Sequence, residues 1–219
     1  MISEITDLDR ILVAAGDVII NDGYDAVSLE RIAQRADVDA DRIDAMFPSV
    51  GDILVSMLNR EFAAMYRGIV DHIERDEKGG LLSRIYLYTL STIYERPLAK
   101  TLFVIDRDAL NAIMRHSHSF SYVPQIGVRA EMIERLQQAG MVRPEVDARA
   151  LSHVISTYSA GIAITAPHDD LDVVIRGFCD LLSRSADTAV VDTRPGKAVY
   201  YDWASSLTLP KSPPADGDR

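Results

Sequence analysis

Charged side chains crowd the first 48 residues of the chain, and their types suit binding rather than catalysis. Residues 1–48 contain eleven acidic side chains and four basic ones, which gives this segment a net charge of −7. The four basic residues are Arg10, Arg31, Arg35 and Arg42. Guanidinium groups make bidentate contacts to phosphate, whereas a carboxylate-rich face attracts the basic surface of a partner protein. The segment therefore predicts a module that binds either phosphate groups or the basic surface of a protein.

No set of residues in the sequence matches a catalytic or cofactor motif. Gly79-Gly80 lacks the lysine and serine of a nucleotide-binding loop, and Ser156 to Gly161 does not match the Gly-x-Ser-x-Gly elbow of hydrolases. His116 and His118 form a His-x-His pair, but no cysteine or carboxylate cluster nearby completes a metal site. We therefore expect no enzyme activity, no cofactor and no bound metal.

The overall composition is that of a globular protein with an acidic surface. The 219 residues are 47% hydrophobic and 26% charged, and the net charge is −10. Such a surface repels nucleic acid at long range, so a DNA-binding role needs a locally basic face. The single cysteine, Cys179, excludes an internal disulfide, and its apolar neighbours predict a buried side chain. The acidic start and the lack of a long apolar run predict a cytoplasmic protein without a membrane segment.

Hydrophobic residues recur at intervals of three and four along nearly the whole chain, which predicts an all-α protein of about nine helices. The expected helices span about residues 5–20, 28–36, 39–47, 49–74, 81–94, 97–115, 125–139, 146–165 and 171–185. We place an N-terminal module at residues 1–48, a second helical domain at 49–186 and an irregular tail at 187–219, which contains four prolines. Within the tail, Val199 to Trp203 is apolar enough to pack on its own domain.

Residues 5–47 have the pattern of a helix–turn–helix module. Three short helices are expected, with Asp37-Val38-Asp39 as the turn between the second and the third. Ser28 is in position to cap the second helix, and Asp39 is in position to cap the third. In modules of this kind the third helix enters the major groove of DNA.

The segment from Ile11 to Leu54 resembles the N-terminal domain of the TetR/AcrR family of bacterial transcriptional regulators. The residues that carry the resemblance are Ile11, Ala14, Ala15, Gly23, Tyr24, Ser28, Ile32, Ala33, Ala36, Val38, Ile43, Phe47, Pro48, Ser49 and Leu54. The resemblance implies an all-α fold, with the helix–turn–helix module followed by a ligand-binding and dimerisation domain. It also implies a homodimeric, small-molecule-responsive repressor that binds operator DNA.

The sequence departs from the pattern of that family at positions that commonly contact DNA. Asp37 stands where the family usually has a turn glycine, and Asp39 where it has a serine or threonine. Asp44 and Val50 replace a tyrosine and a lysine that commonly touch phosphate, and Gly51 replaces an acidic residue. Positions that preserve the fold are kept, while positions that hold phosphate have become acidic or apolar.

Two functions therefore stay open for the N-terminal module. If DNA binding is retained, the expected contact residues are Ser28, Arg31, Arg35 and Arg42. If it is lost, a protein partner is expected to dock on the acidic face made by Asp37, Asp39, Asp41 and Asp44.

The resemblance assigns two further roles to the second domain. A pocket for a small hydrophobic effector is expected at Tyr66, Tyr88, Phe103, Arg107, His116 and Tyr122. A four-helix dimer interface, built from the last two expected helices of each subunit, is expected at Leu151, Ile155, Tyr158, Ile162, Val174, Phe178 and Leu181. Large apolar residues at helical spacing are also typical of core packing inside one chain. For both sets of residues, the functional role and a role in the core therefore stay open here.

Overall fold

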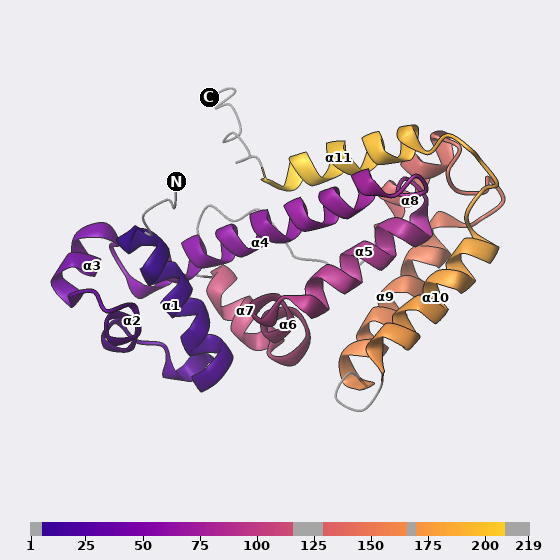
Figure 1. Ribbon diagram of the computed structural model, residues 1–219. Helices are drawn as coiled ribbons and strands as arrows, with labels where there is room; N and C mark the ends of the chain where they lie inside the picture. The colour runs from indigo at the N-terminus through magenta and orange to yellow at the C-terminus, as the bar shows by residue number, and fades with distance from the viewer. Residues whose placement is uncertain (1–5, 116–128, 166–169, 209–219) are drawn as a thin grey trace, which may run out of the picture. The chain divides into compact units, whose positions relative to one another are not determined.

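The chain folds into helices joined by turns (Figure 1). The computed structural model describes residues 6–115, 129–165 and 170–208. Within these ranges the regular structure is α-helical, apart from a 3₁₀ turn at Tyr24–Ala26, a π-helical turn at Thr101–Ile105 and an isolated bridge between Val142 and Asp187. The expected all-α fold is therefore confirmed.

The helices belong to two compact units of the chain. The first unit combines Met1–Met65 with Thr92–Phe120, and the second combines Tyr66–Ser91 with Ser121–Arg219. The first unit holds α1 (Asp7–Asp22), α2 (Leu29–Ala36), α3 (Ala40–Met46), α6 (Pro97–Lys100) and α7 (Arg107–Arg115). The second holds α8 (Ala130–Gln138), α9 (Ala148–Thr165), α10 (Leu171–Ser185) and α11 (Arg194–Thr208), while α4 (Val50–Arg75) and α5 (Leu82–Glu95) contribute to both. Of the helices described, none combines the length and the apolar character needed to cross a membrane.

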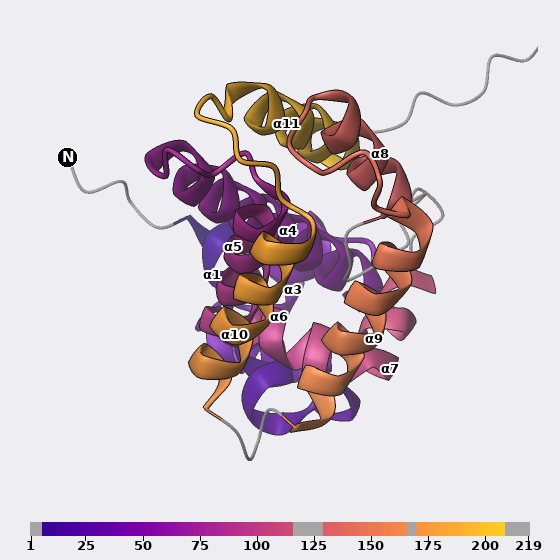
Figure 2. The ribbon, with the colours of Figure 1, turned by 90° about the vertical axis from the view of Figure 1, so that its right-hand side faces the viewer.

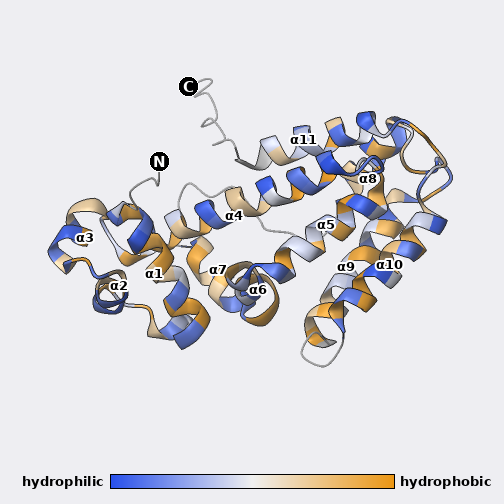
Figure 3. Cartoon of the chain, in the orientation of Figure 1, coloured by the Kyte–Doolittle hydropathy of each residue, from blue (hydrophilic) through white to orange (hydrophobic). Residues whose placement is uncertain are grey.

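The first three helices each bury an apolar side. Ile11 of α1, Ile32 of α2 and Ile43 of α3 are all 0% exposed, and hydropathy alternates along these helices as amphipathic packing requires (Figure 3). The start of α1 is closed by a capping box, in which Thr6 Oγ1 accepts from the Asp9 N–H at 3.2 Å and the Asp9 carboxylate accepts from the Thr6 N–H at 3.3 Å. The module therefore has its own small core.

The single helix expected at residues 97–115 is divided in the structure. α6 runs into the π-helical turn, and Asp106 then leaves the helical region with φ −129° and ψ 79°. The Asp106 carboxylate accepts a hydrogen bond from the Ala109 N–H at 2.9 Å, so it caps a new helix, α7. The sequence prediction was wrong here because an aspartate inside an amphipathic stretch does not by itself reveal that it caps a helix.

The irregular tail expected at residues 187–219 is also corrected, because Arg194–Thr208 forms α11. Pro195 lies in the first turn of this helix, where a missing N–H costs nothing. Tyr200 is 1% exposed, and Trp203 meets Tyr66 edge-on with ring centroids 6.2 Å apart. The expectation that Val199 to Trp203 packs on its own domain is thus confirmed. α11 also lies beside α8 (Figure 2).

Two stretches of backbone meet where α11 begins. A Cβ atom on Gly80 would lie 2.0 Å from the Thr193 carbonyl oxygen, and one on Gly196 would lie 2.1 Å from the Gly80 carbonyl oxygen. Thr193 Oγ1 also donates to the Glu77 carbonyl at 2.6 Å. Only glycine permits so close an approach, so this pair fixes the start of α11 to the turn that follows α4.

We expect Gly80→Ala to lower the free energy of unfolding by about 1–3 kcal/mol, because the added methyl group forces the two backbones apart. Lys78→Ala is the control, since this exposed side chain lies in the same turn and its loss should change stability by less than about 0.5 kcal/mol. Urea denaturation of both variants measures the difference. Equal effects would show that the close approach is not needed.

Candidate functional site

The turn between α2 and α3 has the geometry of a helix–turn–helix. Ser28 Oγ accepts a hydrogen bond from the Arg31 N–H at 3.2 Å, which confirms Ser28 as the cap of α2. Asp37 ends α2 in the left-handed region with φ 54° and ψ 51°, and the Val38 N–H donates to the Ala33 carbonyl at 3.2 Å. Aspartate tolerates this backbone region better than most residues other than glycine. Asp37 can therefore take the place of a turn glycine.

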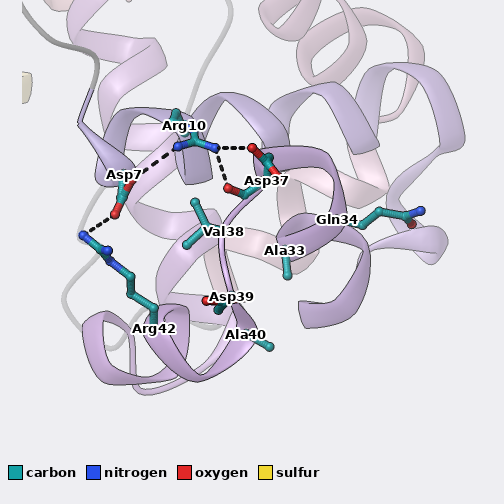
Figure 4. A pocket seen from close by; sticks show the side chains of 9 residues that line it. All are labelled: Asp7, Arg10, Ala33, Gln34, Asp37, Val38, Asp39, Ala40 and Arg42. Atoms are coloured by element: carbon teal, nitrogen blue, oxygen red, sulfur yellow. Dashed lines mark hydrogen bonds and ion pairs between the residues drawn. The ribbon is translucent and has the colours of Figure 1, made fainter.

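α1 holds this turn through a chain of alternating charges (Figure 4). Arg10 donates from Nε to the Ala36 carbonyl at 2.9 Å and pairs with the Asp37 carboxylate at 3.1 Å. Asp7 pairs with Arg10 at 3.5 Å and also with Arg42. These side chains border a hollow of about 640 Å³. Because the charges around it are of both signs, they stabilise the turn and do not favour a ligand of one charge.

The arginines expected to contact DNA are all engaged within the module. Arg31 and Arg35 both pair with the Asp22 carboxylate, at 3.1 and 2.8 Å, and Arg42 pairs with Asp7. With Arg10, every arginine of residues 6–48 is therefore neutralised by a carboxylate of the same module. The sequence did not reveal this pairing, because Arg35 lies thirteen residues from Asp22.

The acidic face expected as the alternative is present and exposed. Asp39, Asp41 and Asp44 are exposed, and within the described part of the chain none of them forms an ion pair. Asp37 is also exposed, although it pairs with Arg10. Asp39 occupies the N-cap position of α3, as expected, but its side chain accepts no hydrogen bond from the helix. The exposed side of α3 therefore carries uncompensated negative charge.

Two other acids of the module are held in their charged form. The pKa of Glu30 lies below its ordinary value, because the carboxylate accepts from its own N–H at the start of α2 and from Ser28. The pKa of Asp9 is also lowered, chiefly by hydrogen bonds from Thr6 and further by Arg60, which pairs with it at 2.9 Å. Protonation near neutral pH therefore does not relieve the negative charge.

The residues expected to line an effector pocket belong to different units. In the second unit, Tyr66 packs on Trp203, and Tyr88 donates to Asp76 at 2.8 Å; burial and Asp76 raise the pKa of Tyr88 to about 12. In the first unit, Phe103 is 3% exposed, and Arg107 donates from Nε to the Phe103 carbonyl at 3.1 Å. The other two expected residues, His116 and Tyr122, lie outside the described residues. The pocket thus stays a prediction.

Most of the residues expected at a dimer interface have contacts inside one chain. Ile155 and Ile162 are 0% and 2% exposed, so they are not available to a partner. Tyr158 stacks on Phe178 with centroids 3.7 Å apart and donates to the Val174 carbonyl at 2.7 Å, which joins α9 to α10. We correct the expectation for Ile155 and Ile162, whereas Tyr158, Val174 and Phe178 are half-buried and their place in a dimer interface stays a prediction. Leu151 is half-buried, and Leu181 is 63% exposed.

A different side of α9 and α10 is apolar and exposed. Val154 and Ile164 of α9 are 55% and 78% exposed, and Val173 and Leu181 of α10 are 60% and 63% exposed. Their spacing puts them on one side of each helix. Gly161 and Gly177 lie on the same sides, and a Cβ atom on either glycine would meet nothing within 4 Å. Of these exposed residues, only Leu181 was expected at the dimer interface.

Among the described residues, no group of three or more histidine, cysteine or acidic side chains is placed to hold a metal ion. The His116 and His118 pair lies outside these residues. Cys179 is buried, as expected.

Comparison with solved structures identifies the fold. No protein-family model matches the chain, and no curated protein matches its sequence. SmeT, the repressor of the Stenotrophomonas maltophilia multidrug efflux pump SmeDEF, is 16% identical with a TM-score of 0.56, over 85% of this chain and 95% of SmeT. The regulator FadR from Bacillus subtilis, in complex with stearoyl-CoA, is 17% identical with a TM-score of 0.55, over 79% of this chain and 96% of FadR. A TetR family transcription regulator from Marinobacter aquaeolei VT8 is 12% identical with a TM-score of 0.52, over 83% and 96% of the two chains.

We expect Asp22→Asn to strengthen binding to a heparin column more than Asp44→Asn does. Both changes remove one negative charge, but only Asp22 pairs with two arginines, so its loss also releases Arg31 and Arg35. The salt concentration at which each variant elutes is the measurement. Equal shifts would show that the ion pairs do not restrain the arginines.

Proposed function

We propose that this chain, which has the fold of TetR-family transcription regulators, is itself a homodimeric transcriptional regulator that binds DNA through its N-terminal module. The observation that carries the proposal is the geometry of α2, the Asp37 turn and α3. This geometry leaves Asp41, Arg42 and Asp44 exposed on α3. A helix presented in this way can enter a major groove.

DNA binding on this surface requires an exchange of partners. The Arg31 and Arg42 side chains are 53% and 68% exposed, and exposed ion pairs contribute at most about 1 kcal/mol. A phosphate can therefore replace Asp22 or Asp7 as the partner of these arginines. Exposed carboxylates on α3 can accept hydrogen bonds from cytosine amino groups, which gives them a role in base recognition.

A second candidate function is favoured by the uncompensated carboxylates Asp39, Asp41 and Asp44. In this alternative the module has lost DNA binding, and its acidic face docks on the basic surface of another protein. The internal pairing of the arginines supports this alternative, because it leaves the net charge of the face negative. Complementary charge would give fast association and strong dependence on ionic strength.

The homodimer is proposed to form through the exposed sides of α9 and α10. Val154, Ile164, Val173 and Leu181 supply apolar area, and Gly161 and Gly177 leave space for the backbone of a partner helix. An isologous contact of two such helix pairs forms a four-helix interface.

Repression controlled by a small hydrophobic effector completes the proposal. The support is the fold shared with SmeT, a repressor, and with FadR, which was solved with stearoyl-CoA. Such a regulator acts in the cytoplasm, where the bacterial chromosome lies.

We expect the purified protein to retain specific genomic DNA fragments at about 50 mM salt and to release them progressively towards about 200 mM, because phosphate contacts weaken with salt. Arg42→Ala should weaken this retention, since it removes the most exposed of the paired arginines of residues 6–48. A filter-binding or pull-down assay of mixed fragments measures both effects.

Failure to retain any fragment at either salt concentration contradicts DNA binding and favours the second candidate. In that case a protein that co-purifies with the wild-type chain should be lost from a variant carrying Asp41→Lys and Asp44→Lys. Retention of the same protein by the variant would contradict docking on the acidic face.

We expect Gly177→Arg to convert the dimer into a monomer in sedimentation equilibrium, because the new side chain prevents a partner helix from approaching. The protomer should stay folded, since the site is open and replacing a helical glycine gains up to about 1 kcal/mol. Ala198→Arg places the same residue on an exposed position of α11 and should remain dimeric. If Gly177→Arg remains dimeric, as Ala198→Arg should, the result would argue against this interface.

A further inference from the structure

The second unit contains a hollow that the sequence did not predict, which we call the strap hollow. Its volume is about 540 Å³, within the range of small-molecule sites. It lies among the turn after α4, the start of α5, the segment after α8, one flank of α10 and residues 187–190, which form the strap between α10 and α11. Its residues are separate from those expected to line an effector pocket.

Positive charge dominates the lining of the strap hollow. Lys78, Arg84, Arg143 and Arg176 line it, against two carboxylates, Asp180 and Asp187. This local excess of cations contrasts with the net charge of −10 of the whole chain.

Both carboxylates of the strap hollow already have partners. Asp180 pairs with Arg184 at 2.7 Å. Asp187 is 4% exposed and accepts from the N–H and the hydroxyl of Ser83, at 3.2 and 2.5 Å. Burial raises the pKa of Asp187, and the hydrogen bonds from Ser83 oppose this effect. Neither acid therefore needs a cation from a ligand.

Several cationic groups of the strap hollow remain able to bind an anion. Within the described part of the chain, the Lys78 ammonium has no ion pair. Arg143 donates from Nε to the Asp187 carbonyl at 3.0 Å, and its two terminal nitrogens have no partner among the described residues. Among the described residues, Arg176 pairs only with the exposed Asp172, one turn away on the same helix. Such pairs are weak and exchange easily.

The remaining wall of the strap hollow is apolar. Leu81 and Cys179 are each 7% exposed, and Leu87 and Val190 are half-buried. Burial raises the pKa of the Cys179 thiol to about 12, so this side chain is a neutral part of the wall. A ligand that fits must therefore join a negative group to an apolar body.

We propose that the strap hollow binds a small amphipathic carboxylate, with its negative group on Lys78, Arg143 and Arg176 and its apolar part against Leu81, Leu87 and Val190. Guanidinium groups suit a carboxylate because they present paired N–H donors. The binding does not depend on DNA contact, so its test is independent of the function proposed above.

The probe for the test is 4-phenylbutyrate, titrated into the full-length protein by isothermal calorimetry. We expect a Kd of about 1 mM or tighter, as suits a ligand of this size. The neutral 4-phenylbutanol and the cationic 4-phenylbutylamine have the same apolar body and should bind at least about tenfold more weakly, because they lack the charge-assisted hydrogen bonds. Equal binding of all three compounds, or no binding of 4-phenylbutyrate, overturns the proposal.

Variants assign the binding to the strap hollow. The double variant Lys78→Ala, Arg176→Gln removes two exposed cations, and Ala189→Trp fills the hollow from its exposed strap. Each of these variants should lower the affinity for 4-phenylbutyrate at least about tenfold. Arg149→Gln changes an exposed arginine of α9 outside the hollow and should leave the affinity unchanged. Far-UV circular dichroism checks that each variant is folded. Unchanged affinity in both hollow variants places the ligand elsewhere and contradicts the proposal.

Discussion

The contact between the backbones at Gly80 and Gly196 determines where the chain runs after α10. Because α11 begins against the turn that follows α4, the strap must cross from the end of α10 to that turn. Along this path, Ser83 holds the strap by donating two hydrogen bonds to the buried Asp187. One side of the strap hollow is therefore a consequence of two glycines. The cations that line it come from the turn after α4, from α5, from the segment after α8 and from α10.

Internal pairing of charge governs the N-terminal module in a similar way. Arg10 holds the Asp37 turn, and Asp7 and Asp22 act as counter-ions for the other arginines. The same guanidinium groups thus stabilise the module and supply its only positive charge. A nucleic-acid ligand must compete with carboxylates that are covalently part of the protein. A basic protein partner meets no such competition, because the exposed acids of α3 form no ion pair with any described residue.

The sequence predicted the local structure better than the contacts between helices. Ile11, Ile32 and Ile43, which carry the family resemblance, are buried, and Ser28 caps α2 as the sequence predicted. The sequence did not show that Tyr158, expected at a dimer interface, stacks on Phe178 and so joins α9 to α10 within one chain. The prolines of the tail suggested irregular structure, although a proline in a first turn is compatible with a helix. Long-range ion pairs and the strap hollow depend on tertiary structure, and no local pattern reveals them.

The sharing of Asp22 between two guanidinium groups has a thermodynamic consequence. If a phosphate takes either arginine, Asp22 loses part of its neutralisation and attracts a sodium or potassium ion from solution. Cation uptake by the protein then offsets part of the cation release from DNA, which normally gives a slope of about −0.9 per phosphate contact in a plot of log K against log salt. The slope measured for this protein would therefore be shallower than the slope expected from its number of phosphate contacts. A salt titration would therefore undercount those contacts, and the complex would tolerate changes in ionic strength better than its geometry suggests.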